Sequence, residues 1–449
     1  MRTLIGSAIL ISVGLGGVLV AACGQQSPKP HVLLVVLDNV RADRTSLCGY
    51  TRPTTPLLTK FCKRDGAACV CSAEAPGSWT VPSHASYFTG TEVPRHGAGT
   101  GTAGEGVRVT AGTHARPLDE KLPTLAEHFS DLDYQTVSVS GNPLVSPLSG
   151  LTRGFDLESH ADAFESLRGQ RLVARLREVL ATQDPERPLF LFLNIADAHR
   201  PWSEIPAGLD WLPRRDRLGF PQKAGKPNPE RQRYIRGQMP VEAARELLAH
   251  LDDVYDWAVR RADDTFGRAL KVLDEDGWTS GTRPVRIIVT SDHGEHLGEH
   301  QLMGHAGPYL YEEITRVPLA VFDSTRPQNL PDKLSAIAAY DLARDGAYHR
   351  RPIRAAAFAS DTWPAWYGES VGFSPAAAVW VGKTKMVYQD GTLRRYDLAS
   401  DPGETHPDSL DAEPQARQLE AMLAALESIV EGEPLDAEML KALEALGYL

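Results

Sequence analysis

Four short segments in the N-terminal two thirds of the chain have the composition of buried strands. Three are almost continuously apolar, as expected where helices cover both faces of a parallel sheet, and the fourth is a weaker example. Helical patterns lie between them. The strand segments are residues 31–37, 136–140, 188–194 and 286–290, and the helical segments are residues 122–132, 170–181 and 241–273. This alternation predicts an α/β fold with a mostly parallel central sheet flanked by helices on both faces.

The C-terminal part has a different pattern, with short apolar segments separated by turn residues. Asp390-Gly391 between two such segments is a typical β-hairpin signal. We therefore expect a small antiparallel sheet followed by two amphipathic helices. The expected strands are residues 377–381, 385–388 and 393–396, and the expected helices are residues 415–430 and 435–446.

The first residues have the features of a lipoprotein signal. Arg2 precedes a glycine-rich apolar segment, and Val20-Ala21-Ala22-Cys23 has the form of a lipobox, in which the cysteine becomes the lipidated N-terminus. The apolar segment is short for a stable membrane span, which needs ~20 residues. We expect a lipid anchor on Cys23 and a location in the bacterial cell envelope, on its periplasmic or extracellular face. A secretory signal or an N-terminal membrane anchor is the alternative.

The chain has 449 residues, enough for a large core and more than one domain. The formal net charge of −11 gives no basic surface of the kind that binds nucleic acid, so we expect no nucleic-acid partner. The expected organisation is a signal peptide (residues 1–22), a tether (23–30), a catalytic domain (31–345) and a C-terminal subdomain with antiparallel strands and terminal helices (346–449).

Four cysteines remain after Cys23, and an even number in an oxidising compartment favours disulfides. Cys69 and Cys71 are too close in sequence to pair easily with each other. One of them is therefore expected to pair with Cys48 and the other with Cys62, and four buried thiols are the alternative. No C-x-x-C pair is present, which argues against a metal–thiolate cluster.

A polar cluster follows each of the four predicted strands. Ligand sites in open α/β sheets lie at the carboxyl ends of strands, so these clusters should meet in one place. They are Asp38-Asn39, Gly141-Asn142, Asp197-Ala198-His199 and Ser291-Asp292-His293.

Thr80 precedes Pro82, which has the position of an early helical residue. A threonine there is commonly a helix cap. The same position also suits a nucleophile, because the positive potential at a helix N-terminus favours an alkoxide and binds an anionic ester group.

Residues 78–90, SWTVPSHASYFTG, resemble the nucleophile segment of the sulfatase family, in the alkaline phosphatase superfamily, which reads C/S-x-P-S-R-A-S-x-x-T-G. In that family the first residue is a Cys or Ser that is oxidised to formylglycine. Thr80 stands there in this chain, and the same oxidation cannot convert it to an aldehyde. The resemblance covers most of residues 31–410 and includes a closing segment from Tyr396 to Glu404.

The resemblance implies a metal site. Asp38 and Asn39 match the first metal-binding pair of the family, with Asn39 offering a neutral oxygen, and Asp292 and His293 match the second. Together with the Thr80 hydroxyl, this set suits Zn²⁺ or Mn²⁺ better than Ca²⁺, which prefers six or more oxygens. One divalent metal ion is therefore expected, and Zn, Mn, Mg and Ca are the candidates.

Two histidines are implied in catalysis. His199 matches the family histidine that contacts the ester group. His305 stands where many sulfatases have a lysine and related phosphonate or phosphate diesterases have a histidine, and it could protonate the leaving oxygen. His296 and His300 flank the same loop, and a second metal ion there is the less favoured interpretation.

Three further residues are expected near the substrate. His84 replaces the arginine of the family segment and is expected to orient the nucleophile. Arg41 recurs in the family just after the first metal pair, which implies a contact with substrate or with the metal ligands. Asn142 follows a predicted strand and is expected to bind substrate.

The substitution at Thr80 favours phosphorus chemistry. A sulfated threonine cannot release sulfate by forming an aldehyde, whereas a phosphorylated threonine can be resolved by in-line attack of water or an alcohol. The set Asp38, Thr80, Asp292 and His293 also resembles lipoteichoic acid synthases and phosphoethanolamine transferases, which use a threonine nucleophile.

The resemblance therefore implies a metal-dependent hydrolase or transferase that acts on a phosphate or sulfate ester of a glycan, a lipid head group or a small molecule. One alternative is a sulfatase that works without formylglycine. The other is an inactive lipoprotein of the same fold that binds an anionic glycan.

Overall fold

The structure of the chain is a computed structural model. It describes residues 28–101, 107–110, 113–163, 166–202, 209, 211–212, 229–278, 281, 283–305, 307–358, 374–409, 417 and 419–424. The predicted signal peptide with Cys23, most of the tether and the helix predicted over residues 435–446 lie outside these ranges. Within them, every helix is either too short or too polar to cross a membrane.

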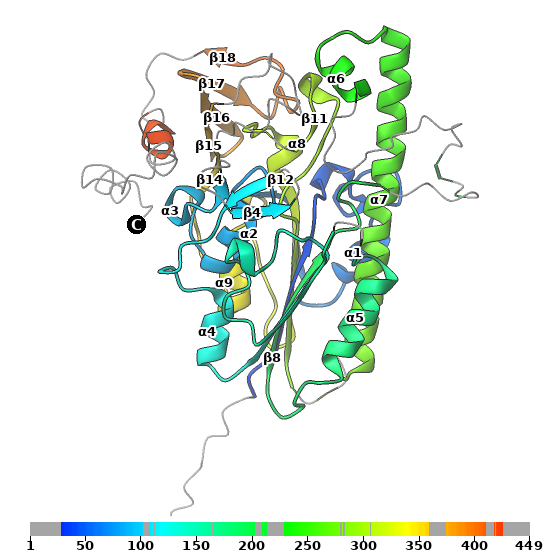
Figure 1. The fold of residues 1–449 in the computed structure, drawn as a ribbon, viewed down its shortest axis with the longest axis vertical. Coiled ribbons are helices and arrows are strands. Elements are labelled where there is room, and N and C mark those ends of the chain that lie inside the picture. The colour runs from blue at the N-terminus through cyan, green and yellow to red at the C-terminus, as the bar shows by residue number, and fades with distance from the viewer. Residues whose placement is uncertain are drawn as a thin grey trace, which may run out of the picture.

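An eight-stranded sheet forms the centre of the fold, in the order β13-β2-β12-β9-β1-β8-β6-β7 (Figure 1). All neighbouring strands are parallel except β12, which is antiparallel to both β9 and β2. The strands are β1 (His31–Leu37), β2 (Ala68–Glu74), β6 (Gln135–Ser140), β7 (Leu157–His160), β8 (Leu189–Ile195), β9 (Val285–Thr290), β12 (Arg316–Asp323) and β13 (Leu334–Ser335). The predicted α/β fold with a mostly parallel sheet is confirmed.

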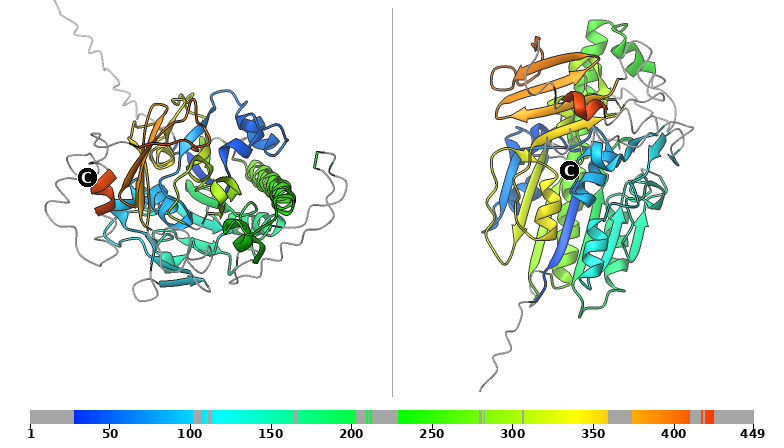
Figure 2. Two further views of the ribbon diagram at one scale, coloured as in Figure 1. Left: turned by 90° about the horizontal axis from the view of Figure 1, so that it is seen from above. Right: turned by 90° about the vertical axis from the view of Figure 1, so that its left-hand side faces the viewer.

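Helices cover both faces of this sheet (Figures 1 and 2). Alternate side chains of β1 enter two separate cores, with Leu34 in one and Leu33 and Val35 in the other. Both cores therefore need a helical layer, which explains why β1 is apolar at every position after His31. The first layer contains α2 (Thr80–Thr89), α4 (Leu125–Asp131) and α9 (Ala338–Arg344), and the second contains α1 (Pro56–Phe61), α5 (Gln170–Leu180) and α7 (Val241–Glu275).

The helix α7 agrees closely with the helical pattern predicted over residues 241–273. Its 35 residues span roughly 50 Å at 1.5 Å per residue. Apolar side chains at helical spacing, including Tyr255, Val259, Ala262 and Phe266, are fully buried against the sheet. The predicted segments 122–132 and 170–181 are observed as α4 and α5.

Strand β12 was not predicted, and Pro318 explains why. Proline cannot donate a hydrogen bond to a neighbouring strand and argues against a central strand. The sheet accommodates Pro318 through an irregular register between Val317 and Leu319 in the pairing with β2.

Two disulfides attach β2 to the segment before it. Cys48 is bonded to Cys71, and Cys62 is bonded to Cys69. The prediction that Cys48 pairs with one of Cys69 and Cys71, and Cys62 with the other, is therefore confirmed.

The predicted C-terminal antiparallel sheet is present, with five strands in the order β14-β15-β16-β17-β18. It lies at one end of the molecule (Figure 2). Residues 419–424, within the predicted helix 415–430, are helical and pack Leu419, Met422 and Leu423 on this sheet. The strands are β14 (Ile353–Ala357), β15 (Ala376–Val381), β16 (Thr384–Gln389), β17 (Thr392–Asp397) and β18 (Asp408–Ser409).

The other elements are short. They are η1 (Ala42–Arg44), η2 (Ser46–Cys48), α3 (Val93–His96), β3 (Gly99–Thr100), β4 (Val107–Thr110), β5 (Thr113–Arg116), η3 (Pro147–Ser149), α6 (Pro229–Ile235), β10 (His296–Leu297), η4 (Glu299–Gln301), β11 (Met303–Gly304) and α8 (Glu312–Thr315).

A buried lysine joins the C-terminal sheet to the rest of the fold. The ammonium group of Lys385, on β16, lies 2.8 Å from Glu404 Oε1 and 3.3 Å from Glu312 Oε1. Glu404 also accepts a hydrogen bond of 2.6 Å from the backbone N–H of Glu312. Since Lys385 and Glu404 are fully buried, each charge depends on the others for its solvation.

We predict that Lys385→Met destabilises the protein by about 3–5 kcal/mol, because it leaves Glu404 and Glu312 without their buried counter-ion. Urea unfolding measures the change. Lys383→Met, on the exposed turn of the same hairpin, should change stability by less than about 0.5 kcal/mol. Equal, small effects of both substitutions would show that the buried ion pairs do not hold the sheet in place.

Candidate functional site

The polar clusters predicted at the strand ends do meet, at the carboxyl end of the central sheet. Asp38 follows β1, which lies between β8 and β9 in the sheet. Asn142 Nδ2 donates a hydrogen bond of 2.7 Å to Asp38 Oδ2, and the backbone N–H of Asn39 donates one of 2.9 Å to Asp292 Oδ1. Residues that are 104 and 253 positions apart in sequence are thus in direct contact.

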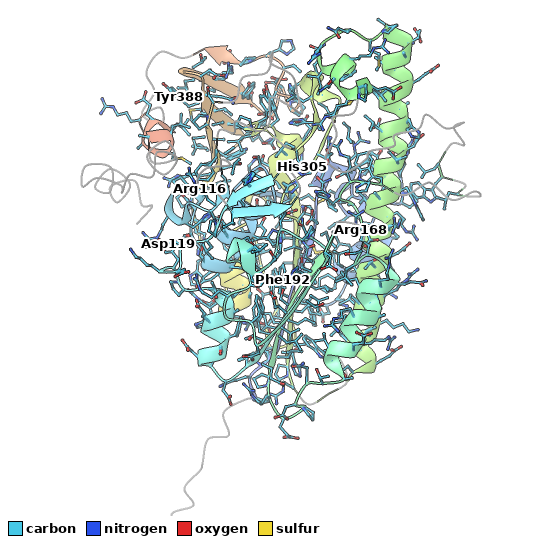
Figure 3. All side chains as sticks on the ribbon, viewed as in Figure 1. Arg116, Asp119, Arg168, Phe192, His305 and Tyr388 are labelled. Atoms are coloured by element: carbon cyan, nitrogen blue, oxygen red, sulfur yellow. A yellow bond between two sulfur atoms is a disulfide. The ribbon has the colours of Figure 1, made fainter. Side chains whose placement is uncertain are left out.

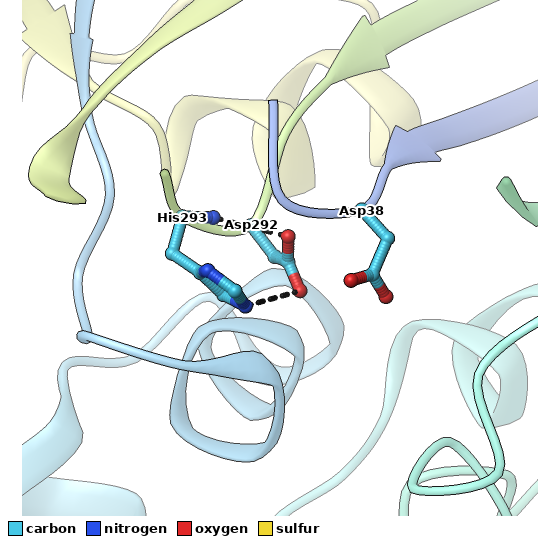
Figure 4. A group of neighbouring side chains, drawn as sticks. All are labelled: Asp38, Asp292 and His293. Atoms are coloured by element: carbon cyan, nitrogen blue, oxygen red, sulfur yellow. Dashed lines mark hydrogen bonds and ion pairs between the residues drawn. The ribbon is translucent and has the colours of Figure 1, made fainter. Parts of the chain in front are cut away.

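Three side chains at this end have the arrangement of metal ligands. One ligand atom each of Asp38, Asp292 and His293 lies within 4.8 Å of the others, and all three residues are fully buried (Figure 4). Asp292 Oδ2 lies 3.3 Å from His293 Nε2. Among the described residues, Asp38 Oδ1, Asp292 Oδ2 and His293 Nε2 have no hydrogen-bond partner. Three buried, unpartnered donors of this chemistry fit a divalent cation.

The tautomer of His293 agrees with this role. Its Nδ1 lies 2.9 Å from the carbonyl oxygen of Gly294, which can only accept, so Nδ1 carries the hydrogen. Burial lowers the pKa of His293, and the neutral ring has its lone pair on Nε2. A fixed Nδ1–H donor is the usual support of a histidine that ligates metal through Nε2.

The charges of the two aspartates also favour binding of a cation. Burial and the nearby Asp38 carboxylate raise the pKa of Asp292 to about 7. Two buried carboxylates with like charge repel each other, and a divalent ion between them would favour the ionised form of both.

Asn39 adds a neutral oxygen to the set. Its backbone has φ 66°, a left-handed conformation that Asn adopts more readily than most residues. Its Nδ2 donates to Glu295 Oε2 at 2.7 Å and to the Ala198 carbonyl at 3.3 Å. The amide nitrogen therefore faces acceptors, and Oδ1 has no partner among the described residues.

Thr80 begins helix α2 and is 1% exposed. Its Oγ1 accepts a hydrogen bond of 3.1 Å from Asn142 Nδ2. Asn142 also contacts Asp38, and its own Oδ1 accepts from the Leu144 N–H at 2.9 Å. Asn142, which was predicted to contact substrate, thus links the Thr80 hydroxyl to the Asp38 carboxylate.

His84 contacts the backbone of Thr80. Its Nδ1 donates to the Thr80 carbonyl at 2.9 Å, and its Nε2 lies 3.4 Å from Asn194 Nδ2. The ring is fully buried between Phe88 and Phe192. These contacts fix the first turn of α2. They reach the backbone of Thr80 rather than its hydroxyl, and His84 Nδ1 also lies 3.6 Å from Asp292 Oδ2.

Arg41 lies behind the site and contacts protein groups. Its guanidinium donates to both oxygens of Asp43, to the Glu295 carbonyl at 2.9 Å and to Glu299 Oε1 at 2.7 Å. Because the side chain is buried and these acceptors surround it, the geometry gives Arg41 a role in holding the loop of Glu295 rather than in a direct substrate contact.

The two predicted catalytic histidines lie together on the solvent side of the aspartates. The ring centroids of His199 and His305 are 5.1 Å apart, and those of His293 and His305 are 4.3 Å apart. The side chain of His305 is 16% exposed, whereas that of Asp292 is fully buried. Figure 3 places His305 beyond the end of the sheet and Phe192 within it.

The two rings have different electrostatic surroundings. His199 Nδ1 donates to the Arg200 carbonyl at 2.6 Å, and burial lowers the pKa of His199 to about 3. His305 Nδ1 donates to Glu295 Oε2 at 3.1 Å. Burial and His293 lower the pKa of His305, while the Glu295 carboxylate opposes that shift. The Asp38 carboxylate opposes the shift at His199, whereas His305 has a direct hydrogen bond to a carboxylate.

Glu295 is a central residue that the sequence interpretation did not single out. It is fully buried and accepts hydrogen bonds from Asn39, His305 and the Arg200 guanidinium. Burial raises its pKa, but Arg200 and His305 outweigh this and hold the pKa well below its usual range. Its position three residues after Asp292 could have identified it as a site residue from the sequence. Asn194 was missed too, and its Nδ2 donates to Asp38 at 3.0 Å.

Two curated relatives match short parts of the chain. The multifunctional alkaline phosphatase superfamily protein PehA of Trinickia caryophylli is 42% identical over 66 residues, which cover 15% of this chain and 12% of PehA. The uncharacterized sulfatase YidJ of Escherichia coli is 33% identical over 97 residues, which cover 21% of this chain and 18% of YidJ. The matched segments span less than a fifth of either relative.

Solved structures match over almost the whole chain. The phosphonate monoester hydrolase of Agrobacterium radiobacter has a TM-score of 0.61 at 17% identity and covers 94% of this chain and 96% of its own. A 4S-sulf protein from a glycosaminoglycan locus of Bacteroides thetaiotaomicron has a TM-score of 0.59 at 14% identity and covers 93% and 99%. At these identities the likeness shows the fold alone.

The sequence profile of the sulfatase family matches residues 30–344, which include the whole central sheet and every residue of the candidate site. With this match over more than half of its length, the chain belongs to the sulfatase family.

Proposed function

We propose that the chain is a metal-dependent phosphoester hydrolase or transferase that uses Thr80 as its nucleophile. The observation that carries this proposal is the Asn142 bridge, which holds the Thr80 hydroxyl next to the Asp38 carboxylate. A threonine that only capped the helix would not need the hydrogen bond from Asn142 to its hydroxyl. Thr80 also begins a ten-residue helix, whose N-terminal amides favour negative charge.

A divalent ion held by Asp38, Asp292 and His293, with Asn39 as a further oxygen donor, would neutralise charge on the ester oxygens and lower the pKa of the Thr80 hydroxyl. Asn142 keeps the hydroxyl oxygen in place by donating to it. Asn194 and Asn142 both donate to Asp38 Oδ2, which leaves Oδ1 of the same carboxylate for the ion.

The proposed reaction has two displacements at phosphorus. Thr80 loses its proton to solvent, its oxygen bonds to phosphorus, and the bond to the leaving oxygen breaks. His305, protonated and paired with Glu295, gives its proton to the leaving oxygen. A water or an acceptor alcohol then attacks the phosphothreonine, its proton passes to His305, and the Thr80 oxygen leaves.

The chemistry of threonine favours phosphorus over sulfur. A phosphothreonine can be resolved by in-line attack, whereas a sulfated threonine has no aldehyde-forming exit. The proposed substrates carry a phosphate or phosphonate ester on a glycan, a lipid head group or a small molecule. Separate incubations with phosphoesters and with sulfate esters, followed by intact-mass measurement and peptide mapping, test this preference. Modification of Thr80 by sulfate esters alone would overturn it.

The lipid anchor is a separate proposal. We infer attachment of Cys23 to a membrane of the cell envelope from the lipobox sequence. Metabolic labelling with an alkyne fatty acid tests it, with Cys23→Ala as the unlabelled control.

We predict that Thr80→Ala lowers kcat by at least about 10³-fold, because removal of a nucleophile leaves only the binding and electrostatic contributions. The melting temperature should stay within a few degrees. Thr89→Ala, at the other end of the same buried helix, is the matched control and should retain activity. Near wild-type turnover by Thr80→Ala would exclude Thr80 as the nucleophile.

Asp292→Asn should lower the bound metal by one equivalent per chain in elemental analysis. It should also remove the stabilisation by added ion, which is about 2.7 kcal/mol at a concentration of 100 times Kd. Asp119→Asn, at an exposed position, controls for nonspecific loss. Unchanged metal content in both Asp38→Asn and Asp292→Asn would rule out the proposed metal site.

His305→Ala should slow esters with poor leaving groups by ~10²–10⁴-fold, the usual contribution of a general acid, and should affect activated nitrophenyl esters far less. His199→Ala should slow both classes alike if His199 only binds the ester oxygens. Equal slowing of both classes by His305→Ala would instead assign His305 a positioning role.

A further inference from the structure

The described chain begins at the amino end of the central sheet, opposite the candidate active site. Strand β1 starts at His31, and Asp38 follows its last residue. Seven residues of parallel strand span roughly 23 Å. In Figure 1 the blue start of the described chain lies at the lower end of the molecule, and β11 and α8, which flank His305 in sequence, lie at the upper end. The start of the chain and the catalytic residues therefore lie at opposite ends of the fold.

Helix α7 runs between these two ends and gives their separation. Near its start, Leu251 packs against Met303, which lies two residues before His305. Beyond its end, Trp278 stacks on His31 with ring centroids 4.6 Å apart. From residue 251 to residue 273 the helix rises by roughly 33 Å, at 1.5 Å per residue. The hairpin before His305 and the start of β1 therefore lie a comparable distance apart along the helix axis.

The residues just before β1 are held against the body of the protein. Lys29 Nζ donates a hydrogen bond of 2.7 Å to the carbonyl oxygen of Leu132, which follows α4. The Arg283 guanidinium, just before β9, donates one of 3.2 Å to the carbonyl oxygen of Lys29. Pro28 and Pro30 on either side of Lys29 restrict the backbone further. The part of the predicted tether that can span the distance to a membrane therefore ends at Pro28.

This short length limits how far the body can move from a lipid on Cys23. A fully extended chain covers at most ~3.6 Å per residue, so the five residue steps from Cys23 to Pro28 reach at most roughly 18 Å. To turn the His305 end toward the bilayer, the amino end of the sheet would have to rise by roughly 33 Å, the span along α7. The tether is too short for that orientation.

We propose that the candidate active site faces away from the membrane that holds the lipid on Cys23, and that its substrates are phosphoesters of water-soluble molecules rather than lipid head groups of that membrane. The orientation rests on the proposed lipid anchor, and the substrate class rests also on the proposed function. A head group of the same bilayer would have to be lifted out to reach Thr80 and His305, which exposes its acyl chains to water. An ester in solution has no such cost.

Energy transfer to labelled lipid tests the orientation without any substrate. The full lipidated chain is placed in phosphatidylethanolamine–phosphatidylglycerol vesicles that contain an acceptor-labelled lipid, and a donor dye is attached to one introduced cysteine. Asp131→Cys marks the amino end, because Asp131 is exposed at the end of α4. Val241→Cys marks the opposite end, because Val241 is 72% exposed at the start of α7. We expect strong transfer from position 131 and weak transfer from position 241.

A longer tether is the matched control. A Gly/Ser insertion of about 30 residues between Ser27 and Pro28 has an r.m.s. span of roughly 30 Å and a larger maximum reach, so it lets the body turn. It should bring the ratio of the two transfer efficiencies close to one. Flotation with vesicles, which Cys23→Ala should abolish, shows separately that the lipid holds the protein. Similar transfer from both positions with the native tether, or a wild type that does not float, would overturn the proposal.

The substrate class is tested with two matched nitrophenyl phosphoesters, one of glycerol in solution and one of diacylglycerol in the vesicles. With the native tether, turnover of the soluble ester should exceed that of the vesicle ester by an order of magnitude or more. The longer tether should raise turnover of the vesicle ester alone, and Thr80→Ala should be inactive on both. Faster turnover of the vesicle ester with the native tether would overturn the proposal. Inactivity of the wild type on both esters would contradict the proposed phosphoester chemistry, while energy transfer would still decide the orientation.

Discussion

Two buried carboxylates at the ends of adjacent strands are the constraint around which this molecule is built. Asp38 directly follows β1 and Asp292 lies two residues after β9, and both side chains are fully buried. Burial of like charges at such short range is unfavourable unless donors and a cation surround them. The backbone N–H groups of Asn39 and His293 both donate to Asp292 Oδ1, and two asparagine amides donate to Asp38. The remaining oxygens converge with His293 Nε2 on one point.

The charged side chains around these carboxylates alternate in sign. Arg41 holds the segment that carries Glu295, and Glu295 in turn binds His305 and Arg200. Each buried charge thus has a partner of opposite charge or a hydrogen-bond donor, which is the condition for keeping ionised groups in a protein interior. His305 is held from behind by Glu295 and is the most exposed of the three neighbouring histidines. On the proposed function, this exposure gives His305 access to the leaving group of a bound ester.

The parts of the fold that the sequence predicts well are those with local causes. Strand β1 is apolar at every position after its first because both of its faces are covered, and α7 has a long apolar stripe at helical spacing. Strand β12 was missed because it contains Pro318, which lies at the register shift against β2 and before the first residue that pairs with β9. The metal-site residues could be proposed because strand ends of a parallel sheet converge whatever lies between them.

The roles of supporting residues depend on contacts that no local pattern encodes. The interpretation of His84 as an orienting group for the Thr80 hydroxyl could not foresee that its ring would be enclosed by Phe88 and Phe192 and would donate to a backbone carbonyl. Arg41 was expected near substrate, but its partners Glu295 and Glu299 are more than 250 residues away in sequence. Glu295 itself gains importance only through Asn39, Arg200 and His305, which come from three different segments.

The identity of the first residue of α2 has a consequence for how the protein matures. The nucleophile of sulfatases with formylglycine is made after translation, so those proteins depend on a modifying enzyme. Thr80 has its hydroxyl from the moment of synthesis, and Asn142 and the start of the helix orient it as soon as the sheet forms. On the proposed function, folding and metal loading complete the active site, and a heterologous host needs no modifying enzyme to generate the nucleophile.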